Sequence, residues 1–283
     1  MIPFLHLGPL TIPTFGLMVA TGLLAAAYLL QADFDRRREQ FLRRGYLKGS
    51  GQPGHHDEGF LIIGIAGLAG LVGARLYHVL ESPRELVADP SLLISRFGFA
   101  WFGGFLGGFV ALLFLARRFG IPALEFMDLC SSAAAVGYAV GRIGCLLSGD
   151  GDYGRPTSWP WPWGMAFPHG VVPTTETCVQ WGWPADCRVY PTPIYEFLIW
   201  LVIAAILWQV GKKAANGGTT GGIFCLYLIL TGLARFVIEF IRINPRSFFG
   251  LSNAQTASLV SVVVGSILLW RIKASSNPQS KSA

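Results

Sequence analysis

The apolar residues of this chain are gathered into seven long runs separated by polar segments. The runs cover residues 15–32, 60–80, 100–116, 126–147, 193–210, 221–241 and 256–270. Each is close to the roughly 17 to 25 residues that cross a bilayer as an α-helix. Membrane β-barrels instead show strands of about ten residues with alternating polarity, which this sequence lacks. The pattern predicts an all-α integral membrane protein with about seven transmembrane helices, forming a single domain over residues 1–283.

Composition supports the membrane class. Hydrophobic residues make up 52% of the chain, charged residues only 13%, and the mean hydropathy is +0.49. A soluble domain carries about 25% charged residues. We attribute the net charge of +6 to anchoring on anionic lipid at the inner membrane face, and we expect no nucleic-acid partner.

Basic residues are distributed unevenly among the connecting segments. One side of the predicted bundle holds thirteen lysine and arginine residues in its connections, and the other side holds six. Because lysine and arginine are enriched in cytoplasmic loops, we expect the N-terminus outside and the C-terminus in the cytoplasm. No basic segment or small-residue cleavage site precedes the first run, so we expect it to be a retained span.

The longest basic connection covers residues 33–59, and we expect it to be a solvated cytoplasmic loop. His55 and His56 are adjacent in this segment and lack the spacing of metal ligands. No metal site is therefore expected there.

The outer connection, residues 148–192, holds five of the nine tryptophans. Tryptophan is enriched where a membrane protein meets the lipid headgroups, and this composition also suits the binding of an amphipathic peptide or a lipid. Cys178 and Cys187 lie nine residues apart in the same segment, on the oxidising side of the membrane. We expect a disulfide between them.

Charged residues inside the apolar runs are the candidates for function. Arg142 lies within the fourth run, in GRIGCLLSGDGDYGR, and Asp150 and Asp152 follow it. An arginine at the centre of a span costs roughly 2.5 to 3.5 kcal/mol and generally faces a polar cavity, a partner or an anionic ligand. Arg235 and Glu239 lie four residues apart in the sixth run, with Arg242 on the same helix face. A neutralising Arg235–Glu239 pair is the structural alternative.

The predicted topology brings several of these residues to the outer ends of their helices. They are Arg75, Gly103, Gly104, Arg142, Tyr195, Glu196, Arg235, Glu239 and Arg242. An outward-facing pocket with several arginines and few carboxylates predicts an anion site, and phospholipid phosphate is the anion most available at that depth. For the glycines, a helix-packing groove is the alternative to a substrate contact.

Several motifs in order resemble one family, the prolipoprotein diacylglyceryl transferases of bacterial inner membranes. They are LGPLTIPTFGLM, GARLYHVL, FGGFLGG, GRIGCLLSGD, YGRP, WPWGMAFP, YPTPIYE and GLARFVIEFIR. The resemblance implies transfer of the sn-1,2-diacylglyceryl group from phosphatidylglycerol to the lipobox cysteine of preprolipoproteins, with release of glycerol phosphate. It implies no metal or organic cofactor, and an active site facing the outer half of the inner membrane.

Residue by residue, the resemblance assigns phosphatidylglycerol binding to Arg142 and an essential Arg–acid pair to Arg235 and Glu239. It places Asp150 and Gly154 in the motif that follows Arg142. We expect Gly103, Gly104 and Tyr195 to contribute to the substrate site and Glu196 to lie near the incoming thiol. Arginine forks suit this chemistry because the displaced phosphate monoester gathers negative charge.

The chain departs from the family at four positions, which carry Phe15, Phe102, Cys145 and Thr231. Phe102 replaces a histidine, so a histidine base is excluded there. The thiol proton must then pass to Asp150, Glu239 or Glu196, unless the arginines stabilise the thiolate themselves. Two alternatives stay open: a paralogue without activity, and a membrane protein that binds or transports phospholipid without chemistry.

Overall fold

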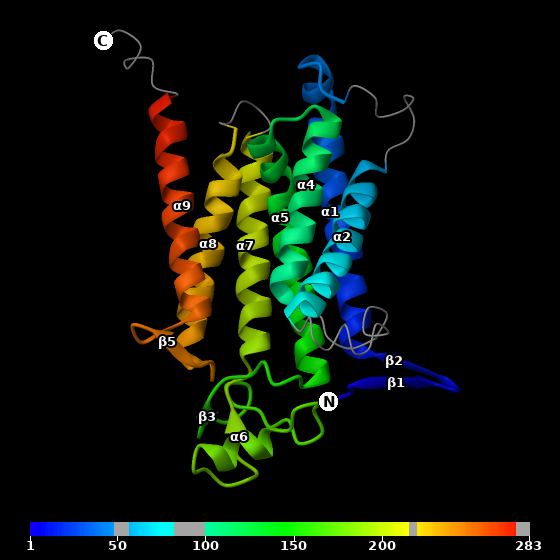
Figure 1. The fold of residues 1–283 in the computed structure, drawn as a ribbon. Helices are drawn as coiled ribbons and strands as arrows, with labels where there is room; N and C mark the ends of the chain where they lie inside the picture. Colours follow the sequence, from blue (N-terminus) through cyan, green and yellow to red (C-terminus); the bar gives the residue numbers. More distant parts are fainter. Residues whose placement is uncertain (48–56, 82–99, 215–219, 276–283) are drawn as a thin grey trace. The chain divides into compact units, whose positions relative to one another are not determined.

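The computed structural model describes residues 1–47, 57–81, 100–214 and 220–275, so His55 and His56 lie outside the described residues. The protein is mostly helical (Figure 1). Its long helices are α1 (Thr14–Arg43), α2 (Glu58–Glu81), α4 (Trp101–Phe119), α5 (Ala123–Ser148), α7 (Thr192–Ala214), α8 (Gly222–Ile238) and α9 (Asn253–Ser275). Within the described ranges, seven helices are long and apolar enough to cross a membrane, which confirms the predicted spans.

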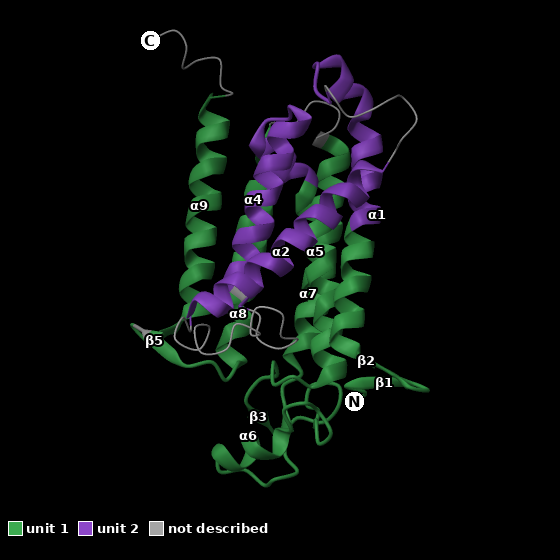
Figure 2. Ribbon diagram, turned by 45° about the vertical axis from the view of Figure 1, so that its right-hand side comes forward, with its two compact units in different colours: residues 1–26, 130–283 green, residues 27–129 purple. Residues whose placement is uncertain are grey.

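The chain forms two compact units (Figure 2). The first comprises Met1–Ala26 and Cys130–Ala283, and the second comprises Ala27–Leu129. The first unit contains α7, α8, α9 and most of α5, together with the outer connection. The second contains α2 and α4. The single domain inferred from the sequence stays a prediction.

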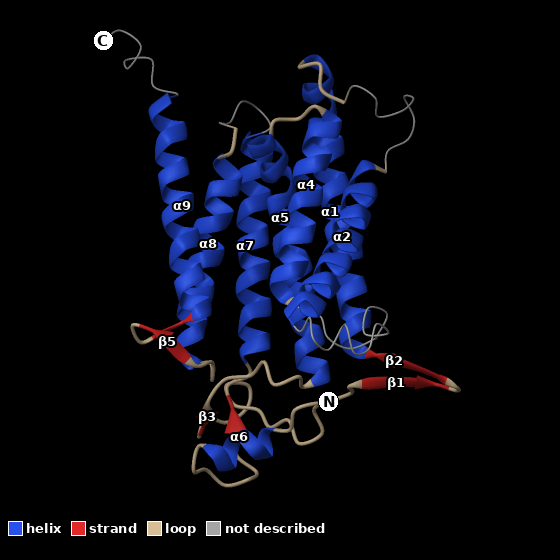
Figure 3. Ribbon diagram, viewed as in Figure 1, coloured by secondary structure: helices blue, strands red, loops and turns tan. Residues whose placement is uncertain are grey.

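Short elements connect the long helices (Figure 3). They are α6 (Thr174–Gln180), the 3₁₀ helix η2 (Glu239–Ile241) and three antiparallel pairs: β1 (Phe4–Leu7) with β2 (Leu10–Pro13), β3 (Pro156–Thr157) with β4 (Arg188–Val189), and β5 (Arg246–Phe248) with β6 (Leu251–Ser252). The sequence did not predict these pairs, because strands of two to four residues are too short for an alternating pattern to be recognised.

The prediction of a solvated loop beginning at Asp33 is wrong. Helix α1 continues to Arg43, and one face of its polar extension is buried, with Asp33 1% exposed and both Phe34 and Phe41 fully buried. Arg37 Nε donates to Asp33 Oδ1 at 3.2 Å, one helical turn apart. Such pairs neutralise the charges, and the two phenylalanine rings pack 5.7 Å apart beneath them. A basic segment can therefore continue a helix instead of ending it.

Helices α2 and α4 pack closely through glycines in the second unit. A Cβ atom on Gly103 would collide with the Gly73 carbonyl oxygen, and one on Gly104 would lie 3.4 Å from Ala74 Cβ. Small residues at such contacts let helix backbones approach each other in a membrane. Gly103 thus has a packing role, and substrate contacts at Gly103 and Gly104 stay predictions.

In the first unit, α5, α7 and α8 pack around a common core. Small α5 side chains, Ala135 and Ala139, face larger α7 residues such as Trp200 and Leu207, and Ile223 of α8 joins the same cluster. The alanines admit the bulkier partners and keep the three helices close. This packing fixes the positions of the charged residues that each helix carries near one end.

Candidate active site

Two arginines from different helices meet at one buried carboxylate. Glu196, in the first turns of α7, is 1% exposed. Arg235 Nη1 of α8 donates to Glu196 Oε1 at 2.6 Å, and Arg142 Nη2 of α5 donates to Glu196 Oε2. Arg142 and Arg235 therefore share one site, as the sequence predicted, although Glu196 binds them directly and lies between them.

A second carboxylate, Asp152, joins Arg142 to Arg242. Asp152 Oδ2 accepts from Arg142 Nη1, and its Oδ1 accepts from Arg242 Nη2 at 2.5 Å. Arg242 Nη1 also donates to the Asp152 main-chain carbonyl at 3.1 Å. Burial acts to raise the pKa of Asp152, but the charges of Arg242 and Arg142 outweigh it and lower that pKa to about 2. Asp152 is therefore ionised at neutral pH.

The third carboxylate, Glu239, begins η2 and is 2% exposed. Its Oε1 accepts hydrogen bonds from Ser252 Oγ at 2.8 Å and Asn244 Nδ2 at 2.7 Å. Its Oε2 lies 3.0 Å from Arg235 Nη2. Glu239 is thus held on one side by neutral donors and pairs with Arg235 on the other, as expected for a residue that orients this arginine.

These six residues form a charge-balanced cluster. Arg142, Arg235 and Arg242 face Asp152, Glu196 and Glu239. The prediction of a pocket with few carboxylates is therefore wrong. The sequence did not show that Asp152 pairs with Arg142 and Arg242, so that three carboxylates balance the three arginines. An anionic ligand must exchange with a carboxylate to reach a guanidinium. Arg235 is the most accessible of the three, with a side chain 23% exposed against 9% for Arg142 and 6% for Arg242.

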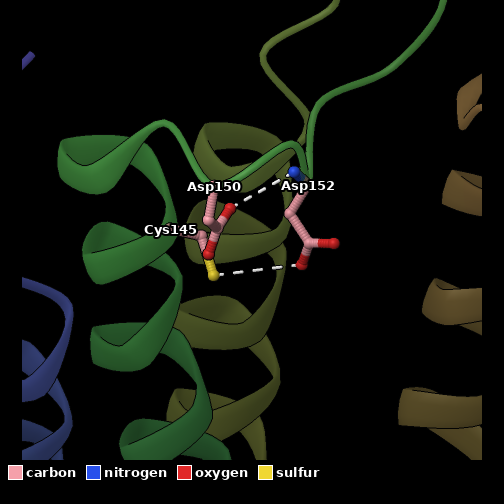
Figure 4. Close-up of side chains that lie close together, drawn as sticks. All are labelled: Cys145, Asp150 and Asp152. Carbon is pink, nitrogen blue, oxygen red and sulfur yellow. Dashed lines mark hydrogen bonds between the residues drawn. The ribbon is translucent and has the colours of Figure 1, made fainter. Parts of the chain in front are cut away.

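Asp150 and Cys145 lie beside this cluster (Figure 4). Asp150 Oδ1 accepts from the Asp152 main-chain N–H at 3.2 Å. Arg142 Nη1 donates to Cys145 Sγ at 3.3 Å, and the thiol lies 3.9 Å from Asp152 Oδ2. Burial, followed by the negative charge of Asp152, raises the pKa of Asp150 above its usual range. In the described chain, salt bridges engage Asp152 but not Asp150.

Cys145, Asp150 and Asp152 also offer ligand atoms that all lie within 4.8 Å of one another. A cation bound there would have to displace or face Arg142 and Arg242, which already neutralise Asp152. Electrostatic repulsion from two guanidinium groups makes this set a poor metal site.

Gly154 and Tyr195 make contacts that connect the segments next to the cluster. A Cβ atom on Gly154 would lie 2.5 Å from the Ile241 carbonyl oxygen, so a side chain there would push away the backbone that precedes Arg242. Gly154 also forms a β-bridge with Arg242. The Tyr195 hydroxyl donates to the Trp163 carbonyl at 2.7 Å, which ties the start of α7 to the outer connection.

The sequence did not assign two residues that the structure places in the site, Tyr138 and Asp152, whereas Arg242 was among the residues predicted at the outer helix ends. The Tyr138 hydroxyl donates to Glu196 Oε1 at 3.3 Å, and the Arg142 guanidinium lies 5.5 Å from the Tyr138 ring centroid. Tyr138 precedes Arg142 by four residues, so their common helix face was a signal available in the sequence. Arg242 shares a face with Arg235 by the same rule.

The predicted disulfide is present in the outer connection. Cys178 and Cys187 are bonded, with their Cα atoms 5.8 Å apart. Both are buried in a small core with Tyr153, Phe167 and Val189.

This fold and site define a class: a multi-pass helical membrane protein with a charge-balanced arginine–carboxylate cluster between three of its helices. Comparison with known proteins identifies the family. The family model for prolipoprotein diacylglyceryl transferase matches residues 3–271, and the chain belongs to this family.

Named relatives resemble the chain over nearly their whole length. A phosphatidylglycerol–prolipoprotein diacylglyceryl transferase from Clostridium tetani is 30% identical over 89% of this chain and 89% of its own. The protein of the same name from Ralstonia pickettii is 30% identical over 99% of this chain and 96% of its own. The one from Cupriavidus pinatubonensis is 31% identical over 94% of this chain and 89% of its own.

Proposed function

We propose that this protein transfers the sn-1,2-diacylglyceryl group from phosphatidylglycerol to the lipobox cysteine of preprolipoproteins. Family membership over residues 3–271 supports this activity, and so do relatives named for the same donor and acceptor classes. The observation that carries the proposal is the meeting of Arg142 and Arg235 at Glu196. The family match disfavours the alternatives of a protein without activity or a lipid carrier.

The reaction has a simple balance of bonds and charges. The acceptor thiolate forms a C–S bond to the glycerol carbon while the C–O bond to the phosphate breaks, so glycerol phosphate departs with the electron pair. The thiol proton passes to a base. Negative charge grows on the phosphate, where charge-assisted bonds from arginine are strongest. Arg235, as the most accessible guanidinium, is the proposed first contact for the lipid phosphate, with Arg142 behind it.

Asp150 is the proposed base among the three carboxylates that the sequence left open. Glu196 pairs with both Arg142 and Arg235, and Glu239 pairs with Arg235. Both carboxylates are therefore already engaged by arginine donors and are less accessible to an incoming thiol. The pKa of Asp150 is raised, mainly by burial and by the charge of Asp152, which favours proton uptake. An oxygen atom of Asp150 lies within 4.8 Å of the Cys145 sulfur atom, which supports a place for an acceptor thiol near this carboxylate.

We propose that the N-terminus and the site lie on the outer side of the bacterial inner membrane. The excess of basic residues in alternate connections supports this orientation, with thirteen on the proposed cytoplasmic side against six. The cluster lies near the C-terminal end of α5 and the N-terminal end of α7, the ends that the disulfide-bonded outer connection joins. Disulfides persist in oxidising compartments, which is consistent with that side.

The test uses the full-length protein in bilayer nanodiscs that contain phosphatidylglycerol, with a synthetic lipobox peptide. Mass spectrometry should show one diacylglyceryl group on the peptide thiol. A peptide with serine in place of the lipobox cysteine, and nanodiscs of phosphatidylethanolamine, should give no product. Lipid binding without product from the folded protein would refute the transferase and favour a lipid-binding protein.

A further inference from the structure

The Cys178–Cys187 disulfide links α6 to the segment around β4. These two segments contact Tyr153 and Gly154, the two residues that follow Asp152. Cys178 lies in α6 and Cys187 directly precedes β4. Both sulfur atoms are buried in a small core that includes Tyr153. The disulfide therefore belongs to this small core and is not part of the charged cluster.

The α6 segment, which contains Cys178, contacts Tyr153. The Tyr153 side chain is 1% exposed and stacks on Phe167, with ring centroids 5.3 Å apart. Its hydroxyl lies 3.3 Å from Thr177 Oγ1 and donates to the carbonyls of Val172 and Pro173, 3.2 and 3.1 Å away. Thr177 is the α6 residue next to Cys178, so α6 and the two residues before it hold the Tyr153 hydroxyl.

The segment around β4, which follows Cys187, contacts Gly154. The Gly154 N–H donates to the Tyr190 carbonyl at 2.8 Å, and the Tyr190 N–H donates back to the Arg155 carbonyl at 3.2 Å. The β3–β4 pairing continues this contact, with Pro156 opposite Val189. Cys187 immediately precedes β4, and Tyr190 directly follows this strand. The disulfide thus crosslinks the segment that anchors Tyr153 to the one that anchors Gly154.

The chain before Asp152 is tied to the residues that lead into α6, because the Val171 N–H donates to the Ser148 carbonyl at 2.9 Å and the Val172 N–H donates to the Gly149 carbonyl at 2.8 Å. Gly149 and Gly151 both have positive φ angles, +59° and +90°, in a region that glycine enters and leaves at little cost. Asp152 must nevertheless hold its carboxylate between Arg142 and Arg242. Thr192 Oγ1 also donates to the Asp152 main-chain carbonyl at 2.6 Å. The position of Asp152 therefore depends on contacts of α6 and its flanking residues, on the Tyr153–Gly154 contacts and on Thr192.

We propose that the Cys178–Cys187 disulfide is a positioning device for Asp152, and through Asp152 for Arg142 and Arg242. This inference rests on the proposed role of the arginine cluster in diacylglyceryl transfer. Without the crosslink, α6 and β4 separate from each other, Tyr153 and Gly154 lose their common support, and the carboxylate leaves the two guanidinium groups. Arg142 and Arg242 are then less well aligned for the lipid phosphate.

The chain contains its own reporter for this displacement. Cys145 is buried at 6% exposure, and its thiol lies 3.9 Å from Asp152 Oδ2. Cys130 and Cys225 are buried elsewhere in the same unit. Movement of Asp152 uncovers Cys145 alone, whereas a general loosening of the protein exposes all three thiols.

The experiment compares the wild-type protein with the Cys178→Ser/Cys187→Ser variant in nanodiscs, with N-ethylmaleimide as the probe and peptide mass spectrometry as the readout. Serine adds no new thiol. We expect Cys145 to react about fivefold faster in the variant while Cys130 and Cys225 change less than about twofold, because local opening exposes only the segment that opens. Asp152→Asn, with the disulfide intact, should also speed the labelling of Cys145.

Diacylglyceryl transfer is measured on the same samples. We expect kcat/KM of the disulfide variant to fall about tenfold, since misplacing charged groups weakens transition-state contacts. The inference is overturned if Cys145 labelling is unchanged, if all three thiols react faster together, or if kcat/KM stays within about twofold of the wild-type value. The labelling readout needs no turnover, so a wild-type protein without transfer would refute the proposed function and still leave the positioning of Asp152 measurable.

Discussion

Glu196 is the residue on which the charged cluster depends most. It is buried at 1% exposure and receives hydrogen bonds from Arg142, Arg235 and Tyr138. Its charge offsets much of the cost of placing two guanidinium groups inside a membrane helix bundle. Removing it leaves those groups without their shared acceptor.

We expect Glu196→Gln to lower both stability and transfer. Breaking a buried ion pair by removing one partner costs about 3–5 kcal/mol. The free energy of unfolding or the melting temperature in detergent, measured beside transfer to a lipobox peptide, checks this. The loss should be near the lower end of that range, because Arg142 keeps Asp152 and Arg235 keeps Glu239. Glu196→Asp keeps the charge and should recover part of the stability. A Glu196→Gln protein with wild-type melting and wild-type transfer would contradict the central place given to this carboxylate.

Arg142→Ala should abolish transfer while the protein stays folded. Arg235 still pairs with Glu196, and Arg242 still pairs with Asp152, so neither carboxylate loses its last cation. Loss of one preorganised donor to developing charge lowers the rate by about 100-fold or more. Arg188→Ala, at an exposed position on β4, is the matched control and should transfer normally. Lipoprotein modification at the wild-type rate by Arg142→Ala would refute the assignment.

The proposed base predicts a definite pH dependence. Asp150 must be deprotonated to accept the thiol proton, so the rate should fall as the pH drops through its raised pKa. Asp150→Asn should reduce the rate by about 10²-fold to 10⁴-fold. Asp152 adds a negative charge that raises the pKa of Asp150, so Asp152→Asn should move the acid limb of the pH–rate profile to lower pH. A limb that stays in place in Asp152→Asn would exclude Asp150 as the titrating group.

At this scale the sequence predicted the charges within helices and the pairing of Arg235 with Glu239, but it missed the pairing of Asp152 with Arg142 and Arg242. Arg142, Arg235 and Glu239 stand out because an ionisable residue in an apolar run needs a reason. Asp152 follows the helix in a glycine-rich turn, where charged residues are usually solvated, and its contact with Arg242 spans ninety residues of chain. Only the path of the outer connection brings them together.

Among the elements, α2 and α4 show how glycine sets helix spacing. A Cβ atom on Gly103 would collide with the Gly73 carbonyl oxygen, whereas one on Gly64 of α2 would meet nothing within 4 Å. In the sequence, both positions are glycines within an apolar run, and their surroundings do not distinguish them. The structure separates a contact glycine from one with open space beside it.

We expect Gly103→Ala to destabilise the protein and Gly64→Ala to be neutral or slightly stabilising. Overpacking a tight contact costs about 1–3 kcal/mol, and alanine favours a helix over glycine by about 1 kcal/mol where there is room. Melting temperatures of the two variants in the same detergent provide the comparison. Equal melting temperatures would show that α2 and α4 do not pack as closely as described.

The long elements were predictable because bilayer thickness sets the length of each apolar run. The extension of α1 beyond residue 32 was not, since the basic segment resembles a cytoplasmic loop until the pairing of Arg37 with Asp33 is known. The β-pairs were missed for a different reason. Each is held by a few main-chain hydrogen bonds that leave no periodic pattern in the side chains.

For the whole molecule, the distribution of basic residues predicts its direction across the membrane. Cysteines introduced at exposed positions can test this: Thr11→Cys in β2 and Lys213→Cys near the end of α7. In intact cells, a membrane-impermeant maleimide should label Thr11→Cys, and it should label Lys213→Cys only after the membrane is opened. The reverse pattern would invert the proposed topology and place the charged cluster on the cytoplasmic side.

The equal numbers of cationic and anionic groups in the cluster have a consequence for turnover. In the proposed reaction, Glu196 and Asp152 can pair again with the guanidinium groups once glycerol phosphate departs. These internal counter-ions compete with the product for the same donors, so the protein regenerates its resting state without recruiting ions from solution. A site of bare arginines would retain its phosphate product and slow each successive cycle.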